Sequence, residues 1–325
     1  MVLQKADYQK LWRNLLLARK TDQALVKLQK DGHVHTLMHP GLGQEGVGVG
    51  TCTFLRPTDY LVPSHRGWHH IIAKGMAIRP IIAEHLGRST GCAGGRGGWH
   101  AADMTVGVAG VSGTMGGQFP MTLGLGLAAQ REGDGRVAIC IFGEGASNRG
   151  QFHESLNMAA VFNAPIVWVC EYNKGAAFAP TSFLLAADSM LDYGQPYGMP
   201  TFAADGNDIM ATLAVTQEAV ERARRGEGPS LVQLETYRLG AVVAGMMEAE
   251  LRPEEEVAEA RQRDPVPRFR QQLLDQAWLT EAQIEAIDQD TTDEVEEAVR
   301  QALEDPYPTM EEGLQVYYEP SKGSR

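Results

Sequence analysis

The chain has 325 residues, of which 43% are hydrophobic, so it can bury a sizeable core as one large domain or two modest ones. Its formal net charge of −12 argues against nucleic acid and anionic membranes as main partners. No apolar run approaches the roughly 20 residues of a membrane span. Residues 1–30 form a charged amphipathic stretch rather than a signal peptide. We therefore expect a soluble, cytoplasmic protein.

The cysteines are few and widely spaced. Cys52, Cys92, Cys140 and Cys170 contain no CxxC pair, and two of them lie inside apolar, strand-like runs. This pattern favours reduced core thiols over a disulfide or zinc framework. The sequence also shows no zinc-ligand spacing and no serine in a nucleophile elbow.

The first third of the chain predicts helices separated by polar and glycine-rich loops. Apolar residues recur with a helical period over residues 5–30. Residues 39–55 form a glycine-punctuated loop that leads into a helix of small residues. Residues 59–70 predict a short strand and a polar loop, followed by a helix that continues through 77–87. Residues 91–117 hold too many glycines for the interior of a helix or strand. Because long loops in compact domains are usually functional, we expect this one to be ordered.

From residue 120 onward, apolar strands alternate with helices. The predicted elements, in chain order, are the helix 120–132, the strand 137–142, the helix 151–163, the strand 165–173, the strand 201–206, the helix 208–225 and the strand 230–238. Continuously apolar strands joined by helical crossovers predict a parallel sheet that is covered by helices on both faces.

Beyond the last predicted strand the composition becomes strongly charged, and helical stretches at 266–277 and 280–303 finish the chain. We expect a solvated helical appendage here, with a binding arm as the alternative. The chain then divides into an N-terminal helical segment (1–58), a core (59–240) and a C-terminal segment with a loop and helices (241–325). We expect these segments to form one structural domain.

Polar side chains follow two neighbouring strands of the predicted sheet. Glu144 comes after the strand 137–142, and Asn173 ends the next one, so both are expected in the same crevice. A carboxylate, an amide oxygen and a backbone carbonyl leave room for phosphate oxygens around Mg²⁺. Gly145 and Ala146 offer backbone N–H groups for a phosphate near a helix start. On spacing alone an alternative stays open, in which Glu144 caps its own helix and Asn173 makes a turn.

The surrounding sequence is more specific. The stretch "FGEGASNRGQFHESLNMAAVFNAPIVWVCEYN" resembles the thiamine-diphosphate signature, which begins Gly-Asp-Gly and closes in Asn-Asn or a variant of it. More narrowly, the chain resembles the alpha subunit of the decarboxylating component of 2-oxo acid dehydrogenases, and most closely that of acetoin dehydrogenase. The resemblance runs through nearly the whole chain, and its motifs include "GLGQEGVGVG", "SHRG", "IAKG", "GCAGGRGGWHAAD", "GVSGTMGGQFP", "ERARRGEGPSLVQLETYR", "ALEDPYP" and "VYY".

The resemblance implies a fold, a cofactor and partners. The fold would be α/β: a three-layer thiamine-diphosphate-binding fold with a mainly parallel sheet, helices on both faces, and helical N- and C-terminal extensions. The assembly would be an α2β2 heterotetramer in which this chain holds Mg²⁺ and the diphosphate. A separate beta subunit would hold the aminopyrimidine and supply the glutamate that activates it. A lipoyl acyltransferase and a small 2-oxo acid or acyloin substrate complete the implied partners.

Carried over by position, the resemblance also assigns site residues. Glu144 and Asn173 would be side-chain ligands of Mg²⁺, and Gly175 would contribute a backbone carbonyl. Arg66 would contact the diphosphate, and Met115 would support the bent conformation of the cofactor. The full set of implied cofactor-binding residues is His65, Arg66, Gly113, Met115, Gly143, Glu144, Gly145, Ala146 and Asn173.

The chain departs from the family pattern where the chemistry is expected. Glu144 replaces the usual Asp, which moves the carboxylate outward by one methylene group. Trp68 stands where "HRGHGH" has its first central histidine, and Val242 stands where a loop histidine belongs. The usual serine of that loop is also absent, which argues against kinase control through it. The catalytic candidates that remain are His69, His70 and His100.

Three interpretations stay open. The first is a working alpha subunit with an apolar, aromatic substrate pocket, in which His69 or His70 replaces the lost imidazole. The second is a thiamine-diphosphate enzyme that performs carboligation or non-oxidative decarboxylation. The third is a catalytically silent partner of a beta-like chain. The sequence does not specify the substrate, the acyl acceptor, the beta partner or whether turnover is oxidative.

Overall fold

The structure is a computed structural model that describes residues 2–111, 113–176, 179–244 and 252–314. At its centre lies a parallel sheet with the strand order β1-β2-β3-β7-β6. The strands are β1 (Tyr60–Val62), β2 (Ala138–Gly143), β3 (Ile166–Tyr172), β6 (Thr201–Asp205) and β7 (Ser230–Glu235). The parallel sheet predicted from the apolar strands is therefore confirmed.

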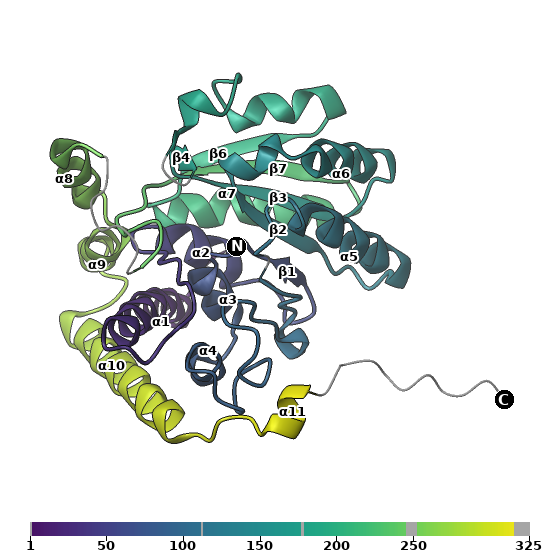
Figure 1. The fold of residues 1–325 in the computed structure, drawn as a ribbon. Helices are drawn as coiled ribbons and strands as arrows, with labels where there is room; N and C mark the ends of the chain where they lie inside the picture. The colour runs from purple at the N-terminus through teal and green to yellow at the C-terminus, as the bar shows by residue number, and fades with distance from the viewer. Residues whose placement is uncertain (1, 112, 177–178, 245–251, 315–325) are drawn as a thin grey trace.

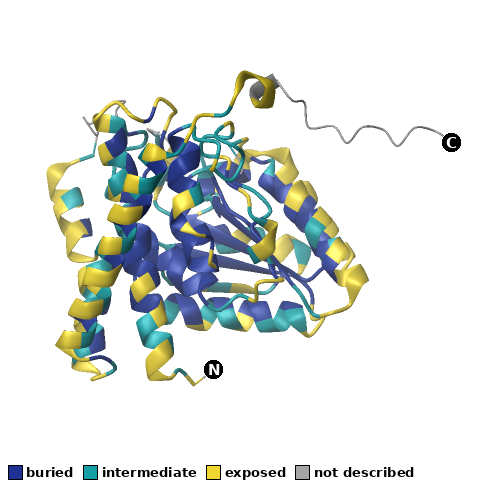
Figure 2. Cartoon of the chain, turned by 90° about the horizontal axis from the view of Figure 1, so that it is seen from below, coloured by how far each residue is buried: buried dark blue, intermediate teal, exposed yellow. Residues whose placement is uncertain are grey.

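Helices cover both faces of the sheet, so the architecture has three layers. On one face, alternate residues of β2 and β3 pack with Phe119 of α5 (Gln118–Glu132) and Phe152 of α6 (Gly150–Val161). The opposite side chains of the same strands join a second core with α1 (Lys5–Lys30), α2 (Glu45–Cys52) and α7 (Ile209–Arg224). Figure 2 shows these buried residues in the interior, with exposed residues on the outer sides of the helices. The predicted α/β fold class is confirmed.

The helix expected to follow residues 59–70 and continue through 77–87 is divided in two, and it begins earlier, at Trp68. α3 (Trp68–Lys74) ends at Gly75, which has the left-handed φ of 110° that favours glycine. The chain then starts again as α4 (Ile78–His85). Beyond it, the glycine-rich loop contains a short 3₁₀ helix, η1 (Met104–Val106), and runs to the start of α5.

Short elements connect the strands near their carboxyl ends. β2 runs directly into the 3₁₀ helix η2 (Glu144–Asn148), which separates the strand from α6. After β3, β4 (Gly175–Ala176) pairs with β5 (Ala179–Pro180) in a small antiparallel sheet. Three more 3₁₀ turns precede β6: η3 (Thr181–Phe183), η4 (Met190–Tyr193) and η5 (Gln195–Tyr197).

The C-terminal helices are part of the core, so the expectation of a solvated appendage is wrong for most of this segment. α10 (Glu281–Glu304) runs alongside α1 (Figure 1) and buries Ile284 and Val295. α9 (Pro265–Asp275) places Phe269 against Trp12 of α1, with ring centroids 6.4 Å apart. α8 (Glu254–Gln262), which the sequence analysis did not predict, is mostly solvated, with Ala260 as its one buried residue. α11 (Met310–Leu314) follows α10.

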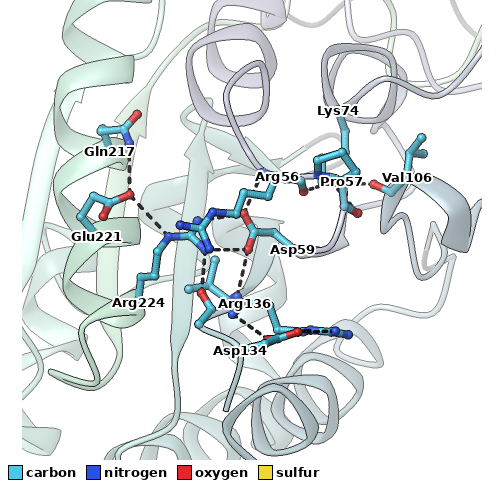
Figure 3. A network of polar contacts seen from close by, with 12 residues as sticks. Arg56, Pro57, Asp59, Lys74, Val106, Asp134, Arg136, Gln217, Glu221 and Arg224 are labelled. Atoms are coloured by element: carbon cyan, nitrogen blue, oxygen red, sulfur yellow. Dashed lines mark hydrogen bonds and ion pairs between the residues drawn. The ribbon is translucent and has the colours of Figure 1, made fainter. Parts of the chain in front are cut away.

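A buried polar network ties the segments beside the short edge strand β1 to α3 and α7 (Figure 3). Asp59, just before β1, accepts two hydrogen bonds from Arg224 of α7, at 3.1 and 2.9 Å. Lys74 of α3 donates to the carbonyl oxygens of Arg56 and Val106, at 2.7 and 2.5 Å. These side-chain hydrogen bonds therefore help to hold β1 in place, because its three residues offer few hydrogen bonds to the neighbouring strand.

All four cysteines are free thiols; Cys92 is half-buried and the other three are buried. Within the described part of the chain, every helix is too short or too polar to cross a membrane.

Candidate functional site

A cavity of about 520 Å³ lies at the carboxyl ends of β2 and β3. Among its lining residues are most of the site residues expected from the sequence: His65, Arg66, Gly113, Met115, Gly143, Glu144, Gly145, Asn173 and Gly175. Four segments distant in the sequence therefore meet at one place. Of the expected cofactor-binding residues, Ala146 is the exception, because it is buried in η2 and does not line the cavity.

The carboxylate of Glu144 is held by the segment that follows β3. Its Oε1 accepts hydrogen bonds from Gly175 N at 2.7 Å and Thr181 Oγ1 at 3.0 Å. Its Oε2 accepts one longer bond, from Asn173 N at 3.3 Å. Burial raises the pKa of this carboxyl group, and these hydrogen bonds oppose the shift. A carboxylate oxygen has two lone pairs, so Oε2 keeps the capacity for a further partner.

Asn173 and Gly175 are brought to Glu144 by a left-handed turn at Lys174, whose φ is 62°. The Asn173 amide donates through Nδ2 to Gln44 Oε1 at 3.3 Å. This bond orients the amide, so that Oδ1 is the atom left to accept from Gly175 N, also at 3.3 Å. Gln44 belongs to the "GLGQEG" motif and was not predicted as a site residue.

Two buried arginines bring positive charge to the cavity. Arg66 and Arg238 are each 7% exposed and both line it. Arg66 donates through Nη1 to the carbonyl oxygens of Pro40 and Val242, at 2.9 and 3.1 Å. Among the described residues, no carboxylate lies within ion-pair distance of it. Burial lowers the pKa of Arg66 to about 10, and Arg238 adds to the shift, so it stays protonated near neutral pH.

Neutral imidazoles stand beside the arginines. His39 donates from Nδ1 to the Val242 carbonyl at 3.1 Å, which leaves Nε2 as an acceptor. Its ring lies edge-on to His65, with centroids 4.5 Å apart. Burial lowers the pKa of His39, and it lowers that of His65 to about 3, with Arg66 adding to the shift. The sequence analysis missed His39, although its place in the glycine-punctuated segment 39–55 is the signal that marks it.

His69 and His70 lie behind the cavity rather than in its wall. Both are buried, and their Nε2 atoms lie 2.7 and 3.2 Å from Oε1 of Glu171, which does line the cavity. Burial alone would raise the pKa of Glu171, but the two histidines lower it well below its usual range. The His69 ring occupies a slot between Gly41 and Gly48, where added Cβ atoms would lie 2.6 and 2.7 Å from His69 atoms.

The same three residues could hold a metal ion, because their ligand atoms all lie within 4.8 Å of one another. Their charge states do not require one. Burial would lower the pKa of His69, but Glu171 raises it. Burial lowers the pKa of His70 to about 4. A protonated His69 paired with Glu171, beside a neutral His70, is therefore a self-consistent buried ion pair.

The two positions at which the chain lacks a family histidine lie in different surroundings. Trp68 is buried in α3, edge-on to His85 with centroids 4.6 Å apart, and is not a cavity-lining residue. Val242 does line the cavity, and its backbone carbonyl accepts from Arg66 and His39. The loop is therefore anchored here by its main chain, whatever side chain residue 242 carries. His100 is exposed and lies just behind the wall, next to Trp99.

A model of the family described as "Dehydrogenase E1 component" matches residues 13–311. The chain belongs to this family. It is 36% identical, over 315 residues, to the alpha subunit of an acetoin:2,6-dichlorophenolindophenol oxidoreductase from Bacillus subtilis, covering 96% of this chain and 94% of the relative. It is 33% identical, over 311 residues, to the pyruvate dehydrogenase E1 component subunit alpha of Rhizobium meliloti, with 95% and 89% covered.

The human pyruvate dehydrogenase E1 alpha subunit, somatic mitochondrial form, is 31% identical over 321 residues, with 97% of this chain and 81% of the relative covered. The predicted resemblance to E1 alpha subunits is therefore confirmed. This chain is an alpha-type member of an oxidoreductase family that depends on thiamine diphosphate.

Proposed function

We propose that this chain is the alpha subunit of a thiamine-diphosphate- and Mg²⁺-dependent acetoin or 2-oxo acid dehydrogenase, with an atypical active site. The observation that carries the proposal is the cavity itself, in which Arg66 and Arg238 stand beside Glu144 and Asn173. A doubly cationic wall next to a carboxylate and an amide oxygen suits a diphosphate bound together with a divalent ion.

The donors present fit a diphosphate. Arg66 points its guanidinium only at carbonyl oxygens, so a phosphate would supply the charged partner that the described residues lack. Gly145 lines the cavity at the start of η2, and its backbone N–H is a further donor candidate. Ala146 stays in the proposal only through its backbone N–H, since its side chain is buried.

The oxygen ligands fit Mg²⁺ with one difference from the family pattern. Glu144 Oε2, Asn173 Oδ1 and the Gly175 carbonyl would hold the ion, with phosphate oxygens completing the coordination. The longer side chain of Glu144 is accommodated because Thr181 and Gly175 bind its other oxygen and draw it toward the β4 segment. The extra methylene group therefore does not by itself dismantle the site.

The cofactor would supply a nucleophilic carbanion and an electron sink. The residues of this chain would bind its diphosphate and shape the space beside it. His39, neutral and with Nε2 free of a proton, is the group best placed to accept a hydrogen bond or a proton from a substrate. His69 and His70 would act only through Glu171, since both are buried behind it.

We further propose a beta subunit in an α2β2 assembly, a lipoyl acyltransferase as acceptor and a cytoplasmic location. The outer sides of α5 and α6, which pack together, expose Met121, Met158, Val161 and Phe162. Exposed apolar side chains on two helices that pack together are the observation that supports a protein partner on this side. Non-oxidative carboligation and a silent partner role are the alternatives, and Val242 in place of an imidazole is the observation that favours them.

The test is a calorimetric titration of thiamine diphosphate with Mg²⁺ into the chain, alone and with its co-expressed beta-like partner. Arg66→Met removes charge-assisted bonds and should weaken binding by about 10- to 100-fold. Glu144→Gln should abolish the dependence on Mg²⁺, whereas Glu144→Asp, which keeps a carboxylate, should retain it. Arg136→Met is the control, because Arg136 lies outside the cavity. Absence of binding under both conditions would favour the silent partner.

A further inference from the structure

The glycine-rich loop that follows α4 is organised around one buried carboxylate. Glu84 is 1% exposed, and its Oε2 accepts hydrogen bonds from the N–H groups of Ala93 and Gly95, at 2.7 and 3.0 Å. Its Oε1 accepts from Gly97 N at 2.5 Å. A Cβ atom added to Gly91 would lie 2.4 Å from Oε2, so the loop also wraps closely around this side chain. Glu84 therefore fixes backbone that belongs to no regular element.

A chain of hydrogen bonds continues from Glu84 to an indole. The carbonyl of Gly97, whose N–H binds Glu84, accepts from His100 Nδ1 at 2.9 Å. His100 Nε2 in turn accepts from Trp99 Nε1 at 3.0 Å. A carbonyl only accepts and an indole N–H only donates, so these partners define the tautomer of His100. Both of its ring nitrogens are engaged.

The chain ends in the wall of the cofactor cavity. Trp99 lines that cavity, and its ring lies against His39, with centroids 5.0 Å apart. Gly113, another lining residue, touches the same pair, since an added Cβ would lie 2.4 Å from His100 Nε2 and 2.8 Å from Trp99 Nε1. The position of the indole therefore sets the space available beside His39.

We propose that Glu84 and His100 are positioning residues that hold Trp99 in the cavity wall, where the indole contacts the bound cofactor and contributes to its affinity. His100 is then not a proton-transfer group, in contrast to the role that the resemblance alone suggested for it. The part of this inference that concerns the cofactor rests on the proposed function. The part that concerns the loop does not.

The loop is tested by hydrogen–deuterium exchange on the chain with its partner. In the wild-type protein, the amides of residues 93, 95 and 97 should be protected although they lie in an irregular segment. Glu84→Gln should accelerate exchange there by more than about tenfold. The glutamine side chain has only one acceptor oxygen, so its NH₂ group would face at least one of the three backbone N–H donors. Asp103→Asn is the matched control, because the Asp103 carboxylate lies in the same loop and accepts from Thr105 N and Oγ1. Unprotected wild-type amides, or equal effects of both variants, would overturn the inference even if Glu84→Gln failed to fold.

The cofactor part is tested by titrating thiamine diphosphate and Mg²⁺ into His100→Ala, Trp99→Phe and the double variant. Each single variant should weaken binding by about five- to tenfold. The double variant should be no weaker than Trp99→Phe, because His100 acts through the indole. In His100→Ala, the pH profile of the turnover number at saturating cofactor should keep both of its limbs, because His100 would not be the proton-transfer group.

Two results would contradict this assignment. If His100→Ala lowers the turnover number by about 10² or more and removes a limb of the pH profile while cofactor affinity is unchanged, His100 transfers protons. If the losses of cofactor affinity in His100→Ala and Trp99→Phe add up in the double variant, the two residues act separately. If the wild type binds no cofactor at all, the proposed function fails and Trp99 has no cofactor to contact. The exchange data then still decide whether Glu84 organises the loop.

Discussion

Single buried charges in this protein are stabilised by quite different neighbours. Glu171 shares its proton-accepting oxygen with two imidazoles and is held ionised by them. Asp22 of α1, by contrast, is 4% exposed, and its Oδ1 has no hydrogen-bond partner among the described residues. Burial raises the pKa of Asp22 to about 7, and the nearby Glu45 adds to the shift. A buried carboxyl group is therefore favourable or costly to ionise according to what the fold places beside it.

Asp22→Asn is expected to stabilise the protein at high pH. A carboxyl group whose folded pKa lies above its unfolded value of 3.8 binds protons more tightly in the native state. Its contribution to stability is therefore present at low pH and is lost as the pH rises through 7. The amide cannot ionise, so the free energy of unfolding should increase by about 4 kcal/mol at pH 8 and hardly at all at pH 4.

Chemical denaturation at several pH values measures this effect. Asp31→Asn is the control, because Asp31 is exposed at the end of the same helix and pairs with Lys27. A gain for Asp22→Asn that is the same at pH 4 and pH 8 would show that ionisation of Asp22 is not its cause.

Among the elements, β1 depends most on side-chain contacts. It has three residues and pairs with β2 in the sheet, and on its other side Leu61 makes a single bridge to Val108. The Asp59 carboxylate is fully buried and accepts two hydrogen bonds from Arg224. It also accepts from Val137 N at 3.1 Å and from Arg56 N at 2.8 Å. One side chain thus joins β1, the start of β2 and α7. The sequence predicted the strand, but nothing in its local pattern predicted that Asp59 would hold it.

Asp59→Asn should destabilise the protein by about 3 kcal/mol, because it leaves the Arg224 guanidinium without its buried counter-charge. Thermal unfolding of the purified protein measures the loss. Asp134→Asn is the matched control, since Asp134 pairs with Arg136 at the exposed end of the same network (Figure 3) and should cost little. Equal losses of stability in the two variants would mean that burial of the Asp59–Arg224 pair does not increase its contribution to stability.

On the scale of the whole molecule, the two ends of the chain share one core. Trp12 of α1 donates to the Ile284 carbonyl of α10 at 3.4 Å, and Lys20 binds the Asp288 carboxylate at 2.7 Å. The segment after α10 returns to the glycine-rich loop, where Ser89 N donates to the Pro306 carbonyl at 2.9 Å. Hydrogen bonds therefore link the segment after the C-terminal helix α10 to the chain at the start of the glycine-rich loop.

Ile284→Ala should lower the free energy of unfolding of the whole protein by about 3 kcal/mol, as expected for a cavity left by a fully buried isoleucine. The loss should appear in a single cooperative transition, seen in parallel by circular dichroism and by tryptophan fluorescence. Ile287→Ala, which truncates a half-buried residue on the same helix, should cost less. A separate early transition for the C-terminal helices, with the main transition unchanged, would instead indicate an appendage.

The sequence by itself determined the strands and helices of the core, the E1 family, and the meeting of Glu144 with Asn173. These features follow from local periodicity, from ordered motifs and from the rule that parallel strands open their crevice at their carboxyl ends. The roles of the site residues and the division at residues 58 and 240 stay predictions.

Only the tertiary structure decided which histidines face the cavity. His39 enters it, while Trp68, His69 and His70 are buried behind it, although "HRGWHH" gives no local sign of this. The slot for His69 is made by Gly41 and Gly48, which lie in a different segment of the chain. The burial of α10 and the hydrogen bonds of Glu84 have the same origin. Each depends on packing between segments that no local sequence pattern connects, so it is settled only when the chain folds.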